Sequence, residues 1–111
     1  MLLLDHNLPH QLRDLLAGYG LVVETAHHRG WTELRNGELT TAAYSSGFRT
    51  ILTRDVLFAT SAAKSIANLP EMAIVIVRLP QRSWRLYSAA FRLAWEAAPI
   101  NPQPCRVVRW P

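Results

Sequence analysis

The chain is 111 residues long, half of them hydrophobic, and its twelve Lys and Arg against eight Asp and Glu leave a formal net charge of +4. This length fits a single domain, expected over residues 1–111, and the basic balance favours a phosphate-rich or acidic partner. Cys105 is the only cysteine, which excludes an intramolecular disulfide, and the apolar run at 2–4 is far too short for a signal peptide or a membrane span. We therefore expect a cytoplasmic protein with no membrane partner.

Strands and helices are predicted to alternate along the chain. Short apolar or β-branched runs bounded by Gly, Pro, Asn or Asp predict strands, and apolar residues at helical spacing predict helices. In chain order we expect a strand at 2–4, a helix at 9–18, a strand at 21–23, a helix at 37–46, a strand at 50–53, a helix at 56–67, a strand at 73–77, a helix at 84–96 and a strand at 105–110. This alternation predicts an α/β fold, a three-layer α/β/α domain with a short, mostly parallel central sheet.

The last predicted helix carries four aromatic residues at helical spacing, Trp84, Tyr87, Phe91 and Trp95. The simplest interpretation places them in the core. Aromatic residues are also enriched at interfaces, so a homodimer or a partner-binding surface stays open as an alternative.

Three acids fall where parallel sheets bind their ligands. Asp5 directly follows one predicted strand, Asp55 stands just past the end of another, and Glu38 lies in the first turn of a helix whose start should face the same edge of the sheet. We expect them to form an oxygen-rich pocket for Mg²⁺ or Mn²⁺, because clustered carboxylates without a cation would repel one another. Each has a second explanation: Asp5 as a helix cap, Glu38 as a surface acid at a helix start, and Asp55 as a turn residue.

Three segments resemble the signatures of a known family. They are Leu3-Leu4-Asp5-His6-Asn7-Leu8-Pro9, Gly30-Trp31-Thr32-Glu33-Leu34-Arg35-Asn36-Gly37-Glu38-Leu39 and Leu52-Thr53-Arg54-Asp55. Together they resemble, in order and spacing, the DUF5615 PIN-like family. The resemblance implies a PIN-like fold and a Mg²⁺- or Mn²⁺-dependent endoribonuclease, the toxin of a toxin–antitoxin pair, which cleaves RNA with a metal-activated water. It also implies a DUF433-type antitoxin as partner, and it assigns the family's acids to Asp5, Glu38 and Asp55.

The sequence departs from a full PIN site in one respect. PIN nucleases usually carry a fourth acid, whereas the downstream acids here, Glu71 and Glu96, fall before a strand and at the end of a helix. An alternative is therefore a catalytically weak PIN-like module that binds RNA or an antitoxin without cutting. A third interpretation, a receiver-like phosphoacceptor domain, would need a lysine after a late strand, and Lys64 does not fit that position.

Further residues beside the acids are predicted to support the site. Two asparagines are expected to hydrogen-bond the acids or a metal-bound water, with helix capping as the alternative; a threonine is expected to orient Asp55, and two arginines to hold a scissile phosphate. These residues are Asn7 and Asn36, Thr53, and Arg54 and Arg78. The neighbouring His27 and His28 lack cysteine partners, so we expect a solvated loop there rather than a zinc site, with RNA contact as a minor alternative.

Overall fold

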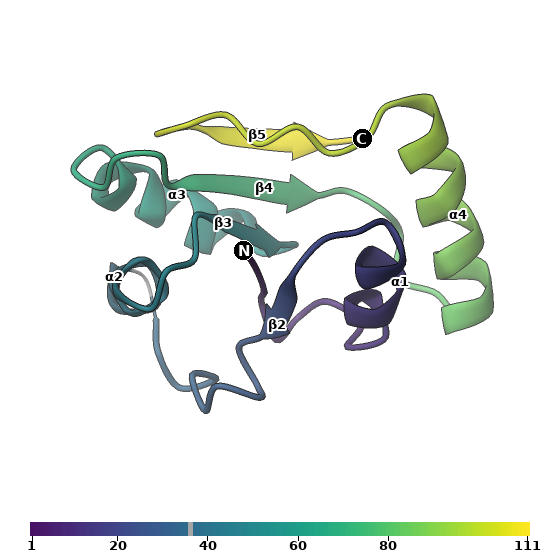
Figure 1. The fold of residues 1–111 in the computed structure, drawn as a ribbon, viewed down its shortest axis with the longest axis horizontal. Coiled ribbons are helices and arrows are strands. Elements are labelled where there is room, and N and C mark those ends of the chain that lie inside the picture. Colours follow the sequence, from purple (N-terminus) through teal and green to yellow (C-terminus); the bar gives the residue numbers. More distant parts are fainter. Residues whose placement is uncertain (36) are drawn as a thin grey trace.

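The computed structural model describes residues 1–35 and 37–111, and strands and helices alternate through them as predicted (Figure 1). Their bounds are β1 Leu2–Leu4, α1 Leu12–Gly18, β2 Val23–Thr25, α2 Gly37–Ser45, β3 Thr50–Thr53, α3 Val56–Ile66, β4 Ala73–Val77, α4 Trp84–Ala97 and β5 Val107–Trp110. The strands form one sheet in the order β2-β1-β3-β4-β5, with every pair parallel. The predicted α/β/α architecture is confirmed. No helix within the described ranges is long and apolar enough to cross a membrane.

Three elements begin later than the sequence predicts, and one of them is the last strand, which begins at Val107 rather than at residue 105. The helix expected from Pro9 begins at Leu12, because Pro9 lies in a turn whose carbonyl accepts from the Leu12 N–H at 3.1 Å. The second strand occupies 23–25 rather than 21–23, since β1 pairs Leu3 with Glu24. Pairing with the buried neighbour strand sets this register, and β-branched composition alone does not.

Each face of the sheet has its own core. In Figure 1, α1 and α4 lie on one side of the sheet and α2 and α3 on the other. Successive side chains of a strand point to opposite faces, so Leu2 and Leu4 pack with α1 and α4, whereas Leu3 packs with α2 and α3. Because both faces are covered, β1 and β4 are apolar throughout and all four residues of β3 are buried, which is why short apolar runs predicted these strands correctly.

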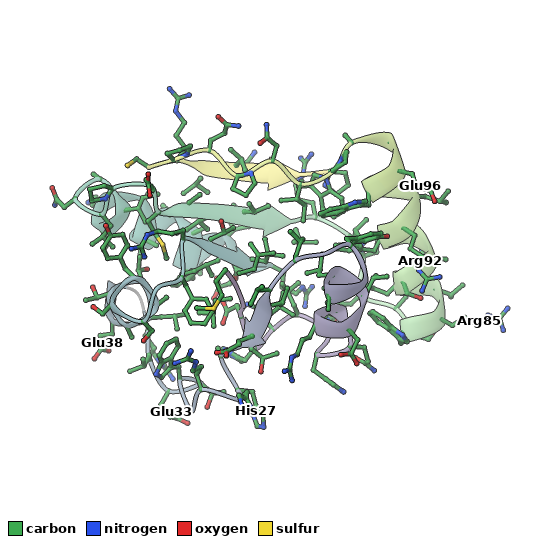
Figure 2. All side chains as sticks on the ribbon, viewed as in Figure 1. His27, Glu33, Glu38, Arg85, Arg92 and Glu96 are labelled. Carbon is green, nitrogen blue, oxygen red and sulfur yellow. The ribbon has the colours of Figure 1, made fainter. Side chains whose placement is uncertain are left out.

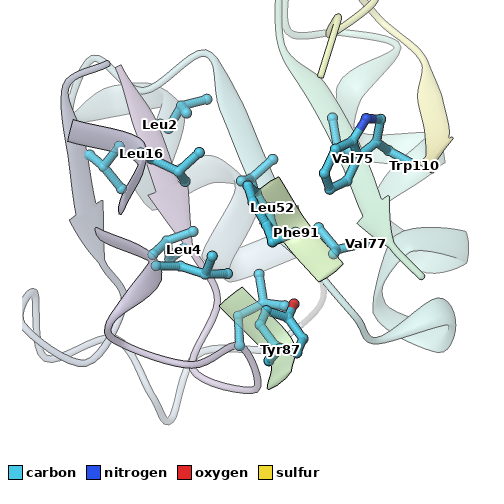
Figure 3. Packing of buried hydrophobic residues seen from close by; sticks show 12 residues of the cluster. Leu2, Leu4, Leu16, Leu52, Val75, Val77, Tyr87, Phe91 and Trp110 are labelled. Atoms are coloured by element: carbon cyan, nitrogen blue, oxygen red, sulfur yellow. The ribbon is translucent and has the colours of Figure 1, made fainter. Parts of the chain in front are cut away.

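The aromatic residues of α4 belong to the core, as the simplest interpretation predicted. Phe91 is fully buried and lies beside Trp110 of β5 (Figure 3), with ring centroids 4.8 Å apart. The ring of Trp95 lies 6.1 Å from that of Phe91. Trp95 in turn stacks on Tyr19, with ring centroids 4.7 Å apart. These contacts attach α4 to the sheet and to the end of α1.

The last crossover has the opposite hand to the other three. We call the face covered by α1 and α4 the first face and the face covered by α2 and α3 the second face. From β1 to β2 the chain moves toward one edge of the sheet, with α1 on the first face. The next two crossovers move toward the other edge, with α2 and α3 on the second face. These three share one hand. From β4 to β5 the chain moves on in the same direction, yet α4 packs on the first face, against the general rule for parallel crossovers. The proline-rich segment 98–106, rather than the helix itself, returns the chain to the start of β5.

Candidate functional site

Two acids lie at neighbouring strand ends, where the helices that follow leave to opposite faces. Asp5 directly follows β1, and its N–H continues the ladder by donating to the Leu52 carbonyl at 2.9 Å. Asp55 follows the adjacent strand β3. After β1 the chain turns to α1 on one face, and after β3 it turns to α3 on the other, which leaves a crevice between the two ends.

Asp5 is a buried carboxylate surrounded by donors. Its side chain is only 4% exposed, and Oδ1 accepts from the His6 N–H at 2.8 Å and lies 3.0 Å from His6 Nδ1. Oδ2 accepts from the Thr53 hydroxyl at 2.8 Å and from the Asn7 amide at 3.4 Å. Asp5 does not cap α1, whose cap position is Gln11, so the capping explanation does not hold for it.

Thr53 and Asn7 join the first and third signature segments. The Thr53 hydroxyl, fully buried, donates to Asp5 and accepts from the Asp55 N–H at 3.0 Å and from the Asn7 amide at 3.3 Å. The Asn7 carbonyl oxygen accepts from the Arg54 N–H at 3.2 Å. Both residues therefore fix the two strand ends relative to each other, and Thr53 contacts the backbone of Asp55 rather than its carboxylate.

Asp55 has a different environment at the same edge. It is exposed, and its Oδ1 accepts from the Phe58 N–H at 3.0 Å, which makes it the N-cap of α3. Its second oxygen, Oδ2, makes no hydrogen bond to any residue that the structure describes. The carboxylate thus begins a helix with one oxygen and leaves the other open to solvent.

Both acids line one hollow of about 400 Å³, here called the carboxylate hollow. Its walls come from the two strand ends, the loop before α2, and the helices α2 and α3. The lining residues are Asp5, His6, Thr32, Leu34, Arg35, Leu39, Asp55, Leu57, Phe58 and Ser61. The lining therefore combines two carboxylic acids, an arginine, a histidine and two hydroxyl residues with four apolar side chains.

Glu38 is not brought to this hollow. It lies exposed in the first turn of α2, on the outer side of that helix in Figure 2, and it does not line the carboxylate hollow. In the described part of the chain, no group of three or more His, Cys, Asp or Glu side chains is arranged to hold a metal ion. The structure therefore assembles two of the three expected acids, and Glu38 matches its alternative description as a surface acid at a helix start.

The remaining predicted residues lie elsewhere. Arg54 is exposed and does not line the hollow. Arg78 follows β4, where its Nε donates to the Pro111 carbonyl at 3.0 Å, so its guanidinium is engaged with the end of the chain. Asn36 falls outside the described residues.

Sequence reasoning missed four polar residues that line the hollow, His6, Thr32, Arg35 and Ser61. Arg35 stands inside the second signature segment, immediately before Asn36, so its position beside a predicted site residue was an available signal. Ser61 lies within α3 with nothing in its sequence context to mark it. Arg35 lines the hollow with the positive charge that the sequence pattern assigns to Arg54 and Arg78.

Comparison of the chain with protein families, with curated proteins and with solved structures finds no match.

Proposed function

We propose that the chain is a metal-dependent endoribonuclease, with Asp5 and Asp55 as the carboxylates that hold Mg²⁺ or Mn²⁺. The observation that carries the proposal is that both acids line one hollow at the carboxyl ends of neighbouring parallel strands. A magnesium ion in a protein commonly takes one or two carboxylates and fills its remaining positions with water and substrate phosphate. Two acids lining one open hollow are consistent with this mode of magnesium coordination.

The chain's own residues divide the work at this site. Asp5 lines the hollow, and hydrogen bonds from Thr53 and Asn7 hold its carboxylate in a fixed orientation. Asp55 supplies the open oxygen, and Arg35 can donate to a non-bridging oxygen of the scissile phosphate. A divalent cation bound there would supply Lewis-acid chemistry, activating water and offsetting phosphate charge.

The toxin role and its antitoxin partner rest on the three signature segments that resemble the DUF5615 PIN-like family. Two of them, 3–9 and 52–55, carry the hydrogen-bonded residues of the site, which supports treating them as a functional unit. Growth arrest on expression, relieved by a co-expressed DUF433-type protein, is the expected behaviour of such a toxin. Growth arrest that persists in a variant without both acids would contradict it.

Metal titration of Asp55→Asn tests the proposal directly. Asparagine caps helices about as well as aspartate, so this variant should keep its fold while losing the charge that faces the hollow. Isothermal titration with Mn²⁺ and cleavage of a labelled RNA should both decline at least tenfold. The matched control is Glu96→Gln, an exposed acid on α4 that lines none of the hollows described here (Figure 2). Full metal binding and cleavage by Asp55→Asn would refute the assignment.

A second candidate is a PIN-like module that binds RNA or an antitoxin without cutting. The absence of Glu38 from the residues that line the carboxylate hollow favours it, since two carboxylates provide fewer metal ligands than three. No binding of Mn²⁺ or Mg²⁺ at millimolar concentration by the wild-type chain would favour this module over the nuclease.

A further inference from the structure

All four histidines of the chain line a second hollow, of about 640 Å³, here called the histidine hollow. They come from two different loops, His6 and His10 from the connection between β1 and α1, and His27 and His28 from the connection after β2. The other lining residues are Leu8, Pro9, Arg13, Asp14 and Thr25. Histidine makes up four residues in 111, so this gathering of imidazoles at one place invites a functional explanation.

The histidine hollow is the middle one of three that share lining residues. It shares His6 with the carboxylate hollow, and it shares Asp14 with a third hollow of about 440 Å³ between α1 and α4, here called the helix hollow. The helix hollow is lined by Gln11, Asp14, Leu15, Gly18, Trp84 and Arg92. A surface track therefore leads from Asp5 and Asp55, past the imidazoles, to the indole of Trp84.

The groups along this track suit a single polynucleotide strand. Within the histidine hollow and the helix hollow, Arg13 and Arg92 outweigh Asp14 in charge, and guanidinium and imidazole N–H groups donate to phosphate oxygens. In the described residues, neither the His27 ring nor the His28 ring makes a hydrogen bond, so both are free to contact a ligand. Imidazole and indole faces stack on unpaired bases, which a duplex does not offer.

We propose that the histidine hollow and the helix hollow together bind single-stranded RNA, with Arg13 and the imidazoles on its phosphates and Trp84 against a base. The inference rests on the proposed function only in taking the carboxylate hollow as the place of the scissile phosphate. The track itself requires no cleavage and can be measured without it.

Fluorescence anisotropy of a labelled 12-nucleotide oligouridine in EDTA tests the track in the full chain. The Arg13→Ala variant and the double variant His27→Ala/His28→Ala should each weaken binding about tenfold, and Arg13→Ala should lower the slope of log affinity against log salt by about 0.7. The matched control is Arg85→Ala. Arg85 neighbours Trp84 in sequence but points outward from α4 and lines none of these hollows, so its loss should leave affinity unchanged (Figure 2).

Three results would overturn the inference. They are no binding of oligouridine by the wild-type chain, equal or tighter binding of a duplex of the same length, and a loss in Arg85→Ala as large as in Arg13→Ala. Thermal denaturation of each variant, followed by circular dichroism, distinguishes a loss of folding from a loss of RNA binding.

The track and the nuclease can fail separately. If oligouridine binds as expected but no divalent cation supports cleavage, the proposed function fails and the track stands. If RNA is cleaved, the track predicts that Arg13→Ala raises KM for the 12-nucleotide substrate about tenfold and leaves cleavage of a dinucleotide unchanged. An unchanged KM for the longer substrate would refute the track alone.

Discussion

The ends of β1 and β3 hold the same residue type in opposite surroundings. At the end of β1, Asp5 is 4% exposed, its oxygens accept from the His6 N–H, the Asn7 amide and the Thr53 hydroxyl, and Oδ1 lies 3.0 Å from His6 Nδ1. At the end of β3, Asp55 is exposed, and among the described residues its carboxylate accepts one hydrogen bond, from the N–H of Phe58. Substitutions at the two positions should therefore differ mainly in their effect on folding.

The difference follows from the hydrogen-bond requirement of buried groups. A buried carboxylate is tolerated only when donors replace the water it has lost. Asp5 receives such donors from the first and third signature segments. An exposed carboxylate keeps its water and can exchange it for a cation. Asp5 is thus tied to the architecture of the sheet edge, and Asp55 is the more accessible ligand.

Asp5→Asn should produce the largest loss of stability. An asparagine side chain turns an NH₂ group toward donors where a carboxylate oxygen now accepts, so at least one buried donor loses its acceptor. We expect the free energy of unfolding to fall by about 3 kcal/mol, measured by urea denaturation. Asp14→Asn, at an exposed acid on α1, is the control and should change stability by less than about 0.5 kcal/mol. Equal effects at the two positions would remove the distinction drawn for Asp5.

Thr53→Val should break the link between the two strand ends. Valine matches the shape of threonine, but its methyl group cannot donate to Asp5 or accept from the Asp55 N–H and Asn7. We expect a loss of about 2 kcal/mol in unfolding free energy. The matched control is Thr50→Val in the same strand, where the side chain is also buried but makes no hydrogen bond within the described residues. A loss at residue 50 as large as at residue 53 would show that the hydroxyl network is not the cause.

Asp55→Ala should have a smaller effect that separates capping from charge. Alanine removes the cap of α3, which typically costs about 1 kcal/mol, whereas Asp55→Asn keeps it. Thermal denaturation should therefore rank the wild type and Asp55→Asn together above Asp55→Ala. If asparagine is as destabilising as alanine, the charge of Asp55 rather than its cap stabilises the fold.

The sequence predicted the two strand ends because apolar runs buried on both faces are easy to recognise. The prediction for Glu38 was wrong because it did not take into account which side of α2 the residue occupies. Successive residues of a helix are about 100° apart, and the buried residues of α2 include Leu39 and Ala43, so Glu38 falls off the inward side. The spacing of the apolar residues within α2 indicates that Glu38 points away from the core, whereas the position of Glu38 in the first turn does not.

Other features could not be read from sequence patterns. The network of Asn7 and Thr53 joins residues 46 positions apart, and only the pairing of β1 with β3 brings them together. The opposite hand of the last crossover depends on which face α4 covers, and its aromatic stripe would suit either face. The shift of β2 to Val23–Thr25 likewise comes from register with β1.

Tyr87 extends the comparison to a buried oxygen that has no partner. Its hydroxyl lies within the core of α1 and α4 with no hydrogen bond to any described residue, although the side chain is only 2% exposed (Figure 3). Burial raises the pKa of the Tyr87 hydroxyl to about 12, and the nearby Arg54 guanidinium partly opposes this shift. The Tyr87 hydroxyl is therefore a buried polar group without a hydrogen bond among the described residues, whereas the buried carboxylate of Asp5 accepts several.

Tyr87→Phe should have the smallest effect at neutral pH, a gain of less than about 1 kcal/mol in unfolding free energy, because it removes an unpaired buried hydroxyl. With a pKa near 10 when unfolded and about 12 when folded, the wild type loses stability as pH rises from 10 toward 12, since the unfolded chain releases this proton first. By pH 11 the advantage of phenylalanine should grow by about 1.4 kcal/mol.

Tyr44→Phe, at a half-buried tyrosine, controls for alkaline effects shared by all tyrosines. A difference between Tyr87→Phe and the wild type that stays constant from pH 8 to pH 11 would mean that the Tyr87 hydroxyl is hydrated in solution and that the contrast with Asp5 is smaller than the structure implies.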